Sequence, residues 1–158
     1  MPNQFKTINL TYLESISEGD NDIIKELINI FLEQLPEFHD GFAEYFANKD
    51  WSGIASLAHK AKSSVLSMGM DELGNKHLKN LELTCKQMIL NDLESQSDPG
   101  PADIAEIEKI NKSFKGYDQD RIDWVKENCN EKTIKGLIDT FNDTCDKAVK
   151  ELNTVLEN

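Results

Sequence analysis

The sequence predicts an all-α fold: an antiparallel up-and-down four-helix bundle with a short N-terminal helix and an inserted helical segment before the last helix. Apolar residues recur at steps of three and four along most of the chain, which is the spacing of amphipathic helices. The alternating pattern of strands is nearly absent. The 158 residues, with only 4 Pro and 8 Gly, are enough for one ordinary domain to bury a core, so we expect one domain over residues 1–158.

The first two predicted helices lie before residue 50. A short helix begins near Asn9 or Thr11 and ends by Gly19. A long helix follows over 20–49, and Gly19–Asn21 supplies its preceding turn and cap. Pro36 falls inside the long helix, but the apolar stripe keeps its phase, so we expect a kinked helix rather than two helices. The stripe comprises Ile24, Leu27, Ile28, Phe31, Leu35, Phe38, Phe42, Tyr45 and Phe46.

Two further helices are predicted over 51–68 and after Asp71. Gly69 interrupts the pattern between them, and Asp71 can cap the second helix. The first has an apolar side built from Ile54, Leu57, Ala58, Ala61, Val65 and Met68, and the second carries Leu73, Leu78, Leu81, Cys85, Met88 and Ile89.

The segment from about 91 to 130 has the weakest pattern. The stretch 95–101, Ser-Gln-Ser-Asp-Pro-Gly-Pro, has the composition of a turn or loop. Apolar residues at 104–114 indicate one short helix, and those at 122–129 indicate a second, or else the start of the final helix with a break near Asn130. A strong pattern from Ile134 to Leu156 predicts a last helix running nearly to the C-terminus.

Composition excludes several classes of partner. With 17 Lys+Arg against 29 Asp+Glu, the formal net charge is −12, which argues against non-specific binding to nucleic acid or anionic membranes. No run approaches the ~20 apolar residues of a membrane span, and residues 1–10 lack a signal-peptide profile, so we expect a cytoplasmic protein. Three widely spaced cysteines, Cys85, Cys129 and Cys145, indicate reduced, semi-buried thiols.

Common catalytic and metal-binding motifs are missing from the sequence. It contains no phosphate-binding glycine loop and no G-x-S-x-G elbow. Its histidines and cysteines lack metal-ligand spacing. Residues 118–123 resemble a calcium loop only in part, since the required Gly and closing Glu are absent. We therefore expect no metal site and no cofactor.

His59 is the most informative single residue. At about 100° per residue it points about 140° away from the centre of the apolar stripe of helix 51–68, so we expect it to be exposed. Its neighbours one turn away, Ser52, Ser56 and Ser63, are small and leave the ring approachable. Lys60 and Lys62 place positive charge beside it in an otherwise acidic chain.

This context favours phosphoryl chemistry. A neutral imidazole has a nucleophilic ring nitrogen, and the ammonium of Lys62, three residues on, could balance the charge of a phosphoryl group on the ring. The simpler interpretation is an ordinary surface histidine.

The stretch 57–69, Leu-Ala-His-Lys-Ala-Lys-Ser-Ser-Val-Leu-Ser-Met-Gly, resembles the signature of histidine-containing phosphotransfer (HPt) domains. Ala61, Lys62 and Gly69 occupy the family's apolar, lysine and second glycine positions. Upstream, the segments 9–13, 19–20 and 31–36 resemble its first two helices. Ser63 replaces the family's usual Gly, and Ser67 stands where it often has Asn. The 91–130 segment has no counterpart in the family; it could pack on the bundle, extend the partner interface, or do neither.

The resemblance implies a phosphoryl carrier rather than an enzyme. His59 would accept the group from a receiver domain's phosphoaspartate, on a hybrid histidine kinase or a response regulator, and pass it to another receiver. Lys62 would balance its charge, Gly69 would be structural, and Mg²⁺ would come from the receiver. We expect an exposed patch to contact the receiver, with Leu66 as its apolar member. The alternatives are a helical adaptor that binds receivers without phosphotransfer and, less supported, a metal-binding bundle. The residues expected at the receiver contact are Ser56, Lys60, Ser63, Leu66 and Ser67.

Overall fold

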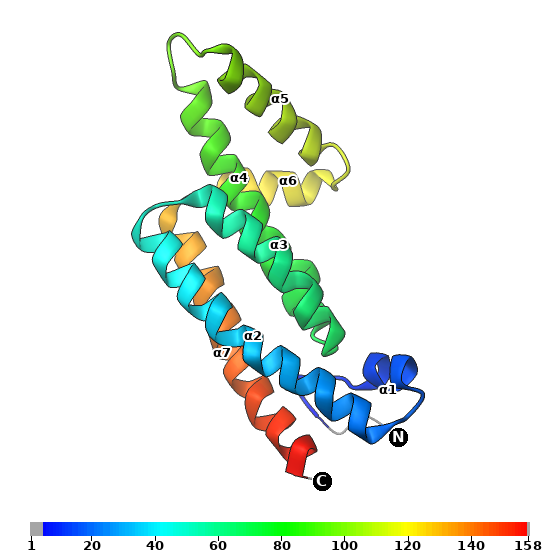
Figure 1. Ribbon diagram of the computed structural model, residues 1–158. Helices are drawn as coiled ribbons and strands as arrows, with labels where there is room; N and C mark the ends of the chain where they lie inside the picture. Colours follow the sequence, from blue (N-terminus) through cyan, green and yellow to red (C-terminus); the bar gives the residue numbers. More distant parts are fainter. Residues whose placement is uncertain (1–4, 158) are drawn as a thin grey trace.

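A computed structural model describes residues 5–157, and every regular element within them is a helix. The predicted all-α class is therefore confirmed (Figure 1). The elements in chain order are α1 (Thr11–Ser17), α2 (Asn21–Ala47), α3 (Trp51–Ser67), the π-helix η1 (Leu73–Leu78), α4 (Lys79–Glu94), α5 (Pro101–Phe114), α6 (Gln119–Glu127) and α7 (Glu131–Glu157).

Side-chain caps start the two helices that follow tight turns. The Asp20 carboxylate accepts hydrogen bonds from the backbone N–H groups of Asp22 and Ile23, and Asp50 accepts one from Gly53. These bonds satisfy N–H groups that have no partner inside a helix. Helix α2 passes through Pro36 as a single element, which confirms the prediction of one helix rather than two.

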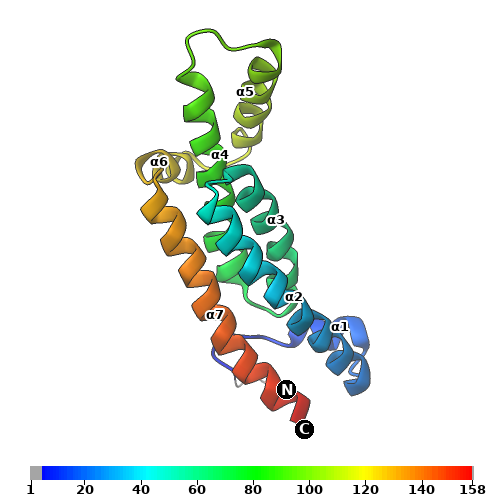
Figure 2. The same ribbon diagram turned by 60° about the vertical axis from the view of Figure 1, so that its left-hand side comes forward.

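Four long helices contact one another around the main core. Helix α2 packs against α3 and α7, and α4 packs against both α3 and α7. Successive members of this set run in opposite directions (Figures 1 and 2). In the core, the Phe141 ring meets Phe38 and Phe42 edge-to-face, with centroids 6.2 and 5.2 Å away.

Between α3 and α4, the structure differs locally from the predicted α-helix. Helical backbone does begin at Asp71, but Leu73–Leu78 is a π-helix. Gly74 lies within it, and a Cβ built there would be 2.7 Å from Leu66 Cδ2. The missing side chain lets η1 approach the preceding helix α3 closely, and this contact between two helices leaves no periodic signal in the sequence.

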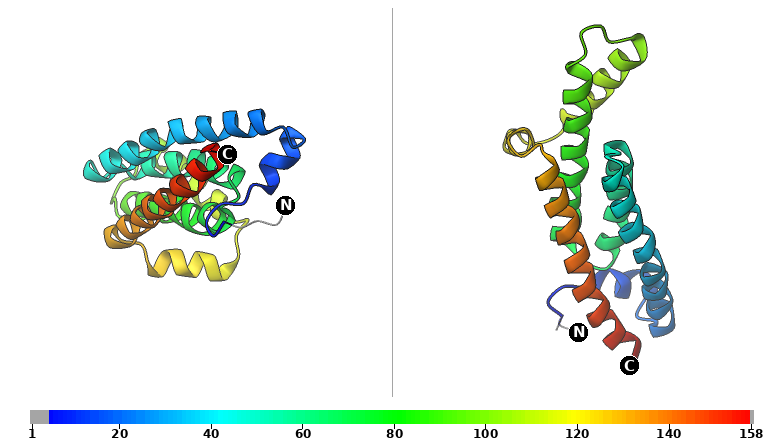
Figure 3. Two further views of the ribbon diagram at one scale, coloured as in Figure 1. Left: turned by 90° about the horizontal axis from the view of Figure 1, so that it is seen from below. Right: turned by 90° about the vertical axis from the view of Figure 1, so that its left-hand side faces the viewer.

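The inserted segment packs as a subsidiary layer on α4. Helix α5 lies beside the distal half of α4, away from the end where α1 lies, and α6 crosses α4 near its middle (Figures 2 and 3). Helix α6 is separate from α7, with the break at 128–130, so the interpretation of 122–129 as a second short helix is confirmed. A second apolar cluster forms here from Leu83, Leu90, Ile110, Phe114 and Val125, with Ile89, Ile107, Tyr117, Ile122 and Trp124 packed against it.

The three cysteines are free thiols. Cys85 and Cys145 are buried and Cys129 is partly buried. Burial raises the pKa of each thiol, that of Cys145 to about 12. Each thiol therefore stays protonated at neutral pH. Within residues 5–157, none of the helices has the length and apolar character needed to cross a lipid bilayer.

Candidate functional site

His59 lies on the outer face of α3. Its side chain is 72% exposed, which confirms the orientation predicted from helix phase. Ser52, Ser56 and Ser63 are exposed along the same face. No large side chain of α3 therefore covers the ring.

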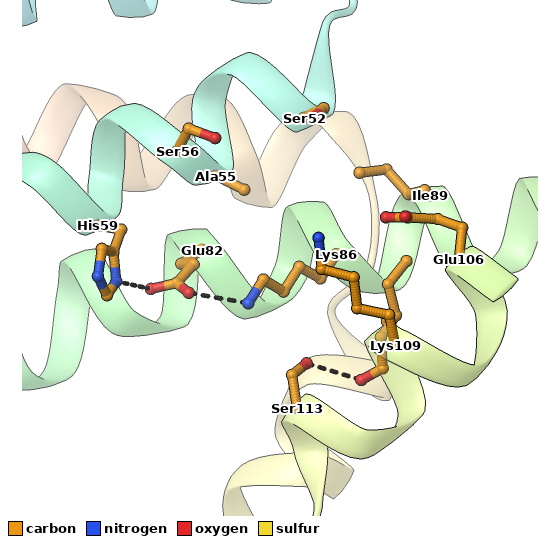
Figure 4. A pocket seen from close by; sticks show the side chains of 11 residues that line it. Ser52, Ala55, Ser56, His59, Glu82, Lys86, Ile89, Glu106, Lys109 and Ser113 are labelled. Atoms are coloured by element: carbon orange, nitrogen blue, oxygen red, sulfur yellow. Dashed lines mark hydrogen bonds and ion pairs between the residues drawn. The ribbon is translucent and has the colours of Figure 1, made fainter.

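The inner edge of the imidazole faces Glu82 of α4. His59 Nδ1 lies 3.3 Å from Glu82 Oε1 (Figure 4). An ionised carboxylate can only accept hydrogen bonds, so this contact requires the proton on Nδ1. In the neutral ring, Nε2 then carries the lone pair. The contact thus selects the tautomer in which Nε2 is unprotonated.

Glu82 is itself held by two lysines of the same helix. Its side chain is 7% exposed; Lys79 Nζ lies 3.0 Å from Oε1 and Lys86 Nζ 3.0 Å from Oε2. Burial by itself would raise the pKa of Glu82, but hydrogen bonds from Lys86 and Lys79 outweigh it and lower the pKa below 4.5. The group facing His59 is therefore a stable carboxylate at neutral pH.

Lys79 connects this carboxylate to the inserted segment. The Lys79 side chain is only 9% exposed, and its Nζ lies 5.5 Å from the centroid of the Tyr117 ring. Burial lowers the pKa of Lys79, but hydrogen bonds to Tyr117 and Glu82 offset this and raise it above 10.5. Arg121 of α6 also donates a hydrogen bond to the carbonyl of Asn75 in η1, at 3.0 Å.

A cleft of about 400 Å³ opens beside His59. Helix α3 lines one side, α4 the floor and α5 the opposite side, as Figure 4 shows. Besides His59, its acidic and basic side chains are Glu82, Lys86, Glu106 and Lys109. The inserted segment is therefore part of the surface around the histidine.

A second cleft, of about 250 Å³, lies at the other end of this face of α3, between α1, α2 and α3. Ser63 and Ser67 line it together with three exposed apolar side chains, Tyr12, Ile16 and Ile30. These three are 52%, 52% and 47% exposed. The described residues thus present an apolar surface one turn beyond His59.

The remaining predicted site residues have varied surroundings. Lys60 is exposed and its Nζ forms an ion pair with Glu37 at 2.7 Å. Lys62 is partly buried and has no ion pair with any residue of the 5–157 range. The Ser67 hydroxyl donates to the Ser63 carbonyl at 3.0 Å.

Leu66 is partly buried and packs beside Gly74 of η1. It lines neither cleft, so the exposed apolar surface near His59 is built from α1 and α2. A contact between Leu66 and a partner stays a prediction.

Gly69 has a left-handed backbone, with φ of +77°. Next to it, the Asn9 N–H donates to the Met68 carbonyl at 2.9 Å. Gly69 thus ends α3 where the N-terminal segment crosses it.

Glu82, Lys79 and Lys86 were missed by reasoning from the sequence. The available signal was the position of Glu82, four residues after Leu78 and three before Cys85, which places a charge beside the apolar stripe of its helix. Its partnership with His59 depends on the register of α3 against α4, which a single sequence does not reveal.

No family model matches the chain, and no curated protein or solved structure is detectably similar to it. Within residues 5–157, no three His, Cys, Asp or Glu side chains are placed to hold a metal ion.

Proposed function

We propose that this chain is a histidine phosphotransfer protein, a cytoplasmic phosphoryl carrier of the HPt type whose four long helices form the bundle of that family. One observation carries the proposal: an exposed imidazole has its inner nitrogen held by a buried, lysine-paired carboxylate. This arrangement supplies an oriented nucleophile and leaves its outer nitrogen open to a partner. The resemblance of residues 57–69 to the HPt signature supports the same assignment.

The transfer step follows from the tautomer. The Nε2 lone pair of His59 attacks the phosphorus of the receiver's phosphoaspartate in line with the P–O bond. An N–P bond forms while that P–O bond breaks, and the aspartate leaves as a carboxylate. The ring keeps its Nδ1 proton and becomes positively charged, and the carboxylate of Glu82 at 3.3 Å stabilises this charge. Attack of a second receiver's aspartate on the phosphorus reverses these changes.

The protein itself orients the phosphoaccepting imidazole but does not supply all the groups that catalyse the transfer. Lys60, next to the ring in sequence, is paired with Glu37, whereas Lys62, three residues after His59, is available to balance the added negative charge. Mg²⁺ and the remaining groups belong to the receiver. The chain is for this reason a carrier and not an enzyme.

Labelling of His59 tests the proposal. A panel of receiver domains from the source organism is phosphorylated with labelled acetyl phosphate and mixed with wild type or with His59→Gln. We expect at least one receiver to transfer label to wild type and none to His59→Gln, because glutamine has no nucleophilic ring nitrogen. His77→Gln, which changes a histidine outside both clefts, should accept label normally. Equal labelling of wild type and His59→Gln would leave the adaptor as the better explanation.

The apolar surface of the second cleft is expected to bind the receiver. Ile30→Asp places a charge in this surface and should weaken receiver binding about tenfold or more, as loss of a central apolar contact does. Ile104→Asp is the matched control, because Ile104 is also 47% exposed but lines neither cleft. Calorimetry measures the receiver affinity of both variants and of wild type. Equal affinities of the two variants would remove this surface from the interface.

A further inference from the structure

The cleft beside His59 has a wall that the HPt resemblance does not provide. Helix α5 lines it with Glu106, Lys109, Ile110 and Ser113, and α5 belongs to the segment without a counterpart in that family. We propose that this cleft-lining face of α5 is part of the partner interface and that Lys109 contacts the edge of the receiver that carries the phosphoaspartate. This inference rests on the proposed function.

A receiver contact of ordinary size, centred near His59, would include the cleft-lining face of α5. A stable protein–protein contact covers about 800 Å² of each partner, a patch roughly 30 Å across. For phosphoryl transfer, the donor phosphorus must come within about 3–3.5 Å of His59 Nε2, so His59 lies inside the contact. Lys109 and His59 line the same cleft of about 400 Å³. A receiver that reaches His59 therefore also meets the wall formed by α5.

The positive charge of Lys109 favours contact with the edge of the receiver that carries the phosphoryl group. Lys86 is paired with Glu82, and Lys60 with Glu37. Lys109 is exposed and forms no ion pair with the described residues. It lies across the cleft from the ring (Figure 4). Phosphoaspartate is doubly negative near neutral pH, so an unpaired ammonium on this wall attracts it.

The wall is also held in place before any partner binds. Ile110 and Phe114 of α5 are buried in the second apolar cluster with Leu83 and Leu90 of α4. The Arg121 bond to Asn75 and the Tyr117 contact with Lys79 anchor the connection between α5 and α6 to η1 and to the start of α4. A pre-positioned wall costs little conformational entropy on binding and can discriminate among receivers by shape and charge.

Charge reversal at Lys109 tests the inference. Lys109→Glu is compared with Lys112→Glu, which makes the same change on α5 at an exposed residue that lines no part of the cleft. For each protein, receiver affinity is measured by calorimetry, phosphotransfer from the receiver by label, and labelling of His59 by phosphoramidate as a small donor. We expect Lys109→Glu to lower receiver affinity and transfer about tenfold or more relative to Lys112→Glu, with phosphoramidate labelling changed less than twofold.

Each other result decides between the two proposals. Equal receiver affinity and transfer in the two variants would overturn the role of Lys109 and leave the carrier function intact. Receiver binding that depends on Lys109, without any transfer to His59, would overturn the carrier function and support the contact. If no receiver binds wild type, both proposals are wrong.

Discussion

Glu82→Ala is expected to lower the free energy of unfolding by about 3 kcal/mol at neutral pH. The substitution leaves the Lys79 ammonium, 9% exposed, without its carboxylate partner, and removing one member of a buried ion pair costs about 3–5 kcal/mol. Lys86 is more exposed, at 29%, and regains hydration when Glu82 is removed. We therefore expect a loss of stability at the lower end of this range. Urea denaturation followed by circular dichroism measures it.

The pH dependence gives this prediction a second readout. The pKa of Glu82 is lower in the folded protein than its ordinary value of 4.5, so the carboxylate stabilises the fold above that pH. Its contribution disappears as the pH falls below 4.5 and through the folded-state pKa. The difference in stability between wild type and Glu82→Ala should therefore be full at pH 7 and shrink in acid.

Two controls define the origin of the effect. Glu72→Ala removes an exposed carboxylate that pairs with Lys76 at 3.8 Å, and such surface pairs contribute about 0–1 kcal/mol. The double variant Lys79→Met/Glu82→Leu replaces both buried charges with apolar groups and should recover most of the lost stability. A cost for Glu82→Ala no larger than that for Glu72→Ala would show that the buried pair does not hold this part of the fold.

Gly69→Ala is expected to destabilise the protein by about 3 kcal/mol. A residue with a Cβ pays about 1–2 kcal/mol for a left-handed backbone. At Gly69 a Cβ would also lie 2.6 Å from the backbone nitrogen of Asn9 and closer still to its carbonyl oxygen. Backbone atoms cannot rotate away, so the N-terminal segment must shift, and overpacking of this kind costs about 1–3 kcal/mol.

Gly19 provides a matched control for the cost of placing a Cβ on a left-handed backbone. Its φ is +78°, nearly equal to that of Gly69, but a Cβ there would meet no atom within 4 Å. Gly19→Ala should therefore cost only about 1 kcal/mol, and the excess in Gly69→Ala measures the contact with Asn9. Thermal or urea unfolding of the two variants gives the comparison, and equal losses would exclude the crowding at Gly69.

Only the part of the candidate site that lies on α3 could be predicted from the sequence. Helix phase placed His59 on the outer face of α3 because the turn of a helix fixes the direction of each side chain relative to its own apolar stripe. Glu82 lies 23 residues later on another helix. Its contact with His59 depends on how α3 and α4 align, and two amphipathic helices with similar stripes can align in several registers.

By itself, the sequence determined the helical class, the approximate limits of the long helices and the exposure of His59, since each follows from periodicity and capping within one segment. Tertiary structure alone decided that η1 is a π-helix, that Lys79 and Glu82 are buried as a pair, and that α5 forms a wall of the cleft at His59. The physical reason is the same in each case. Burial and close approach depend on which distant surface covers a residue, and the pattern of a single segment does not specify that surface.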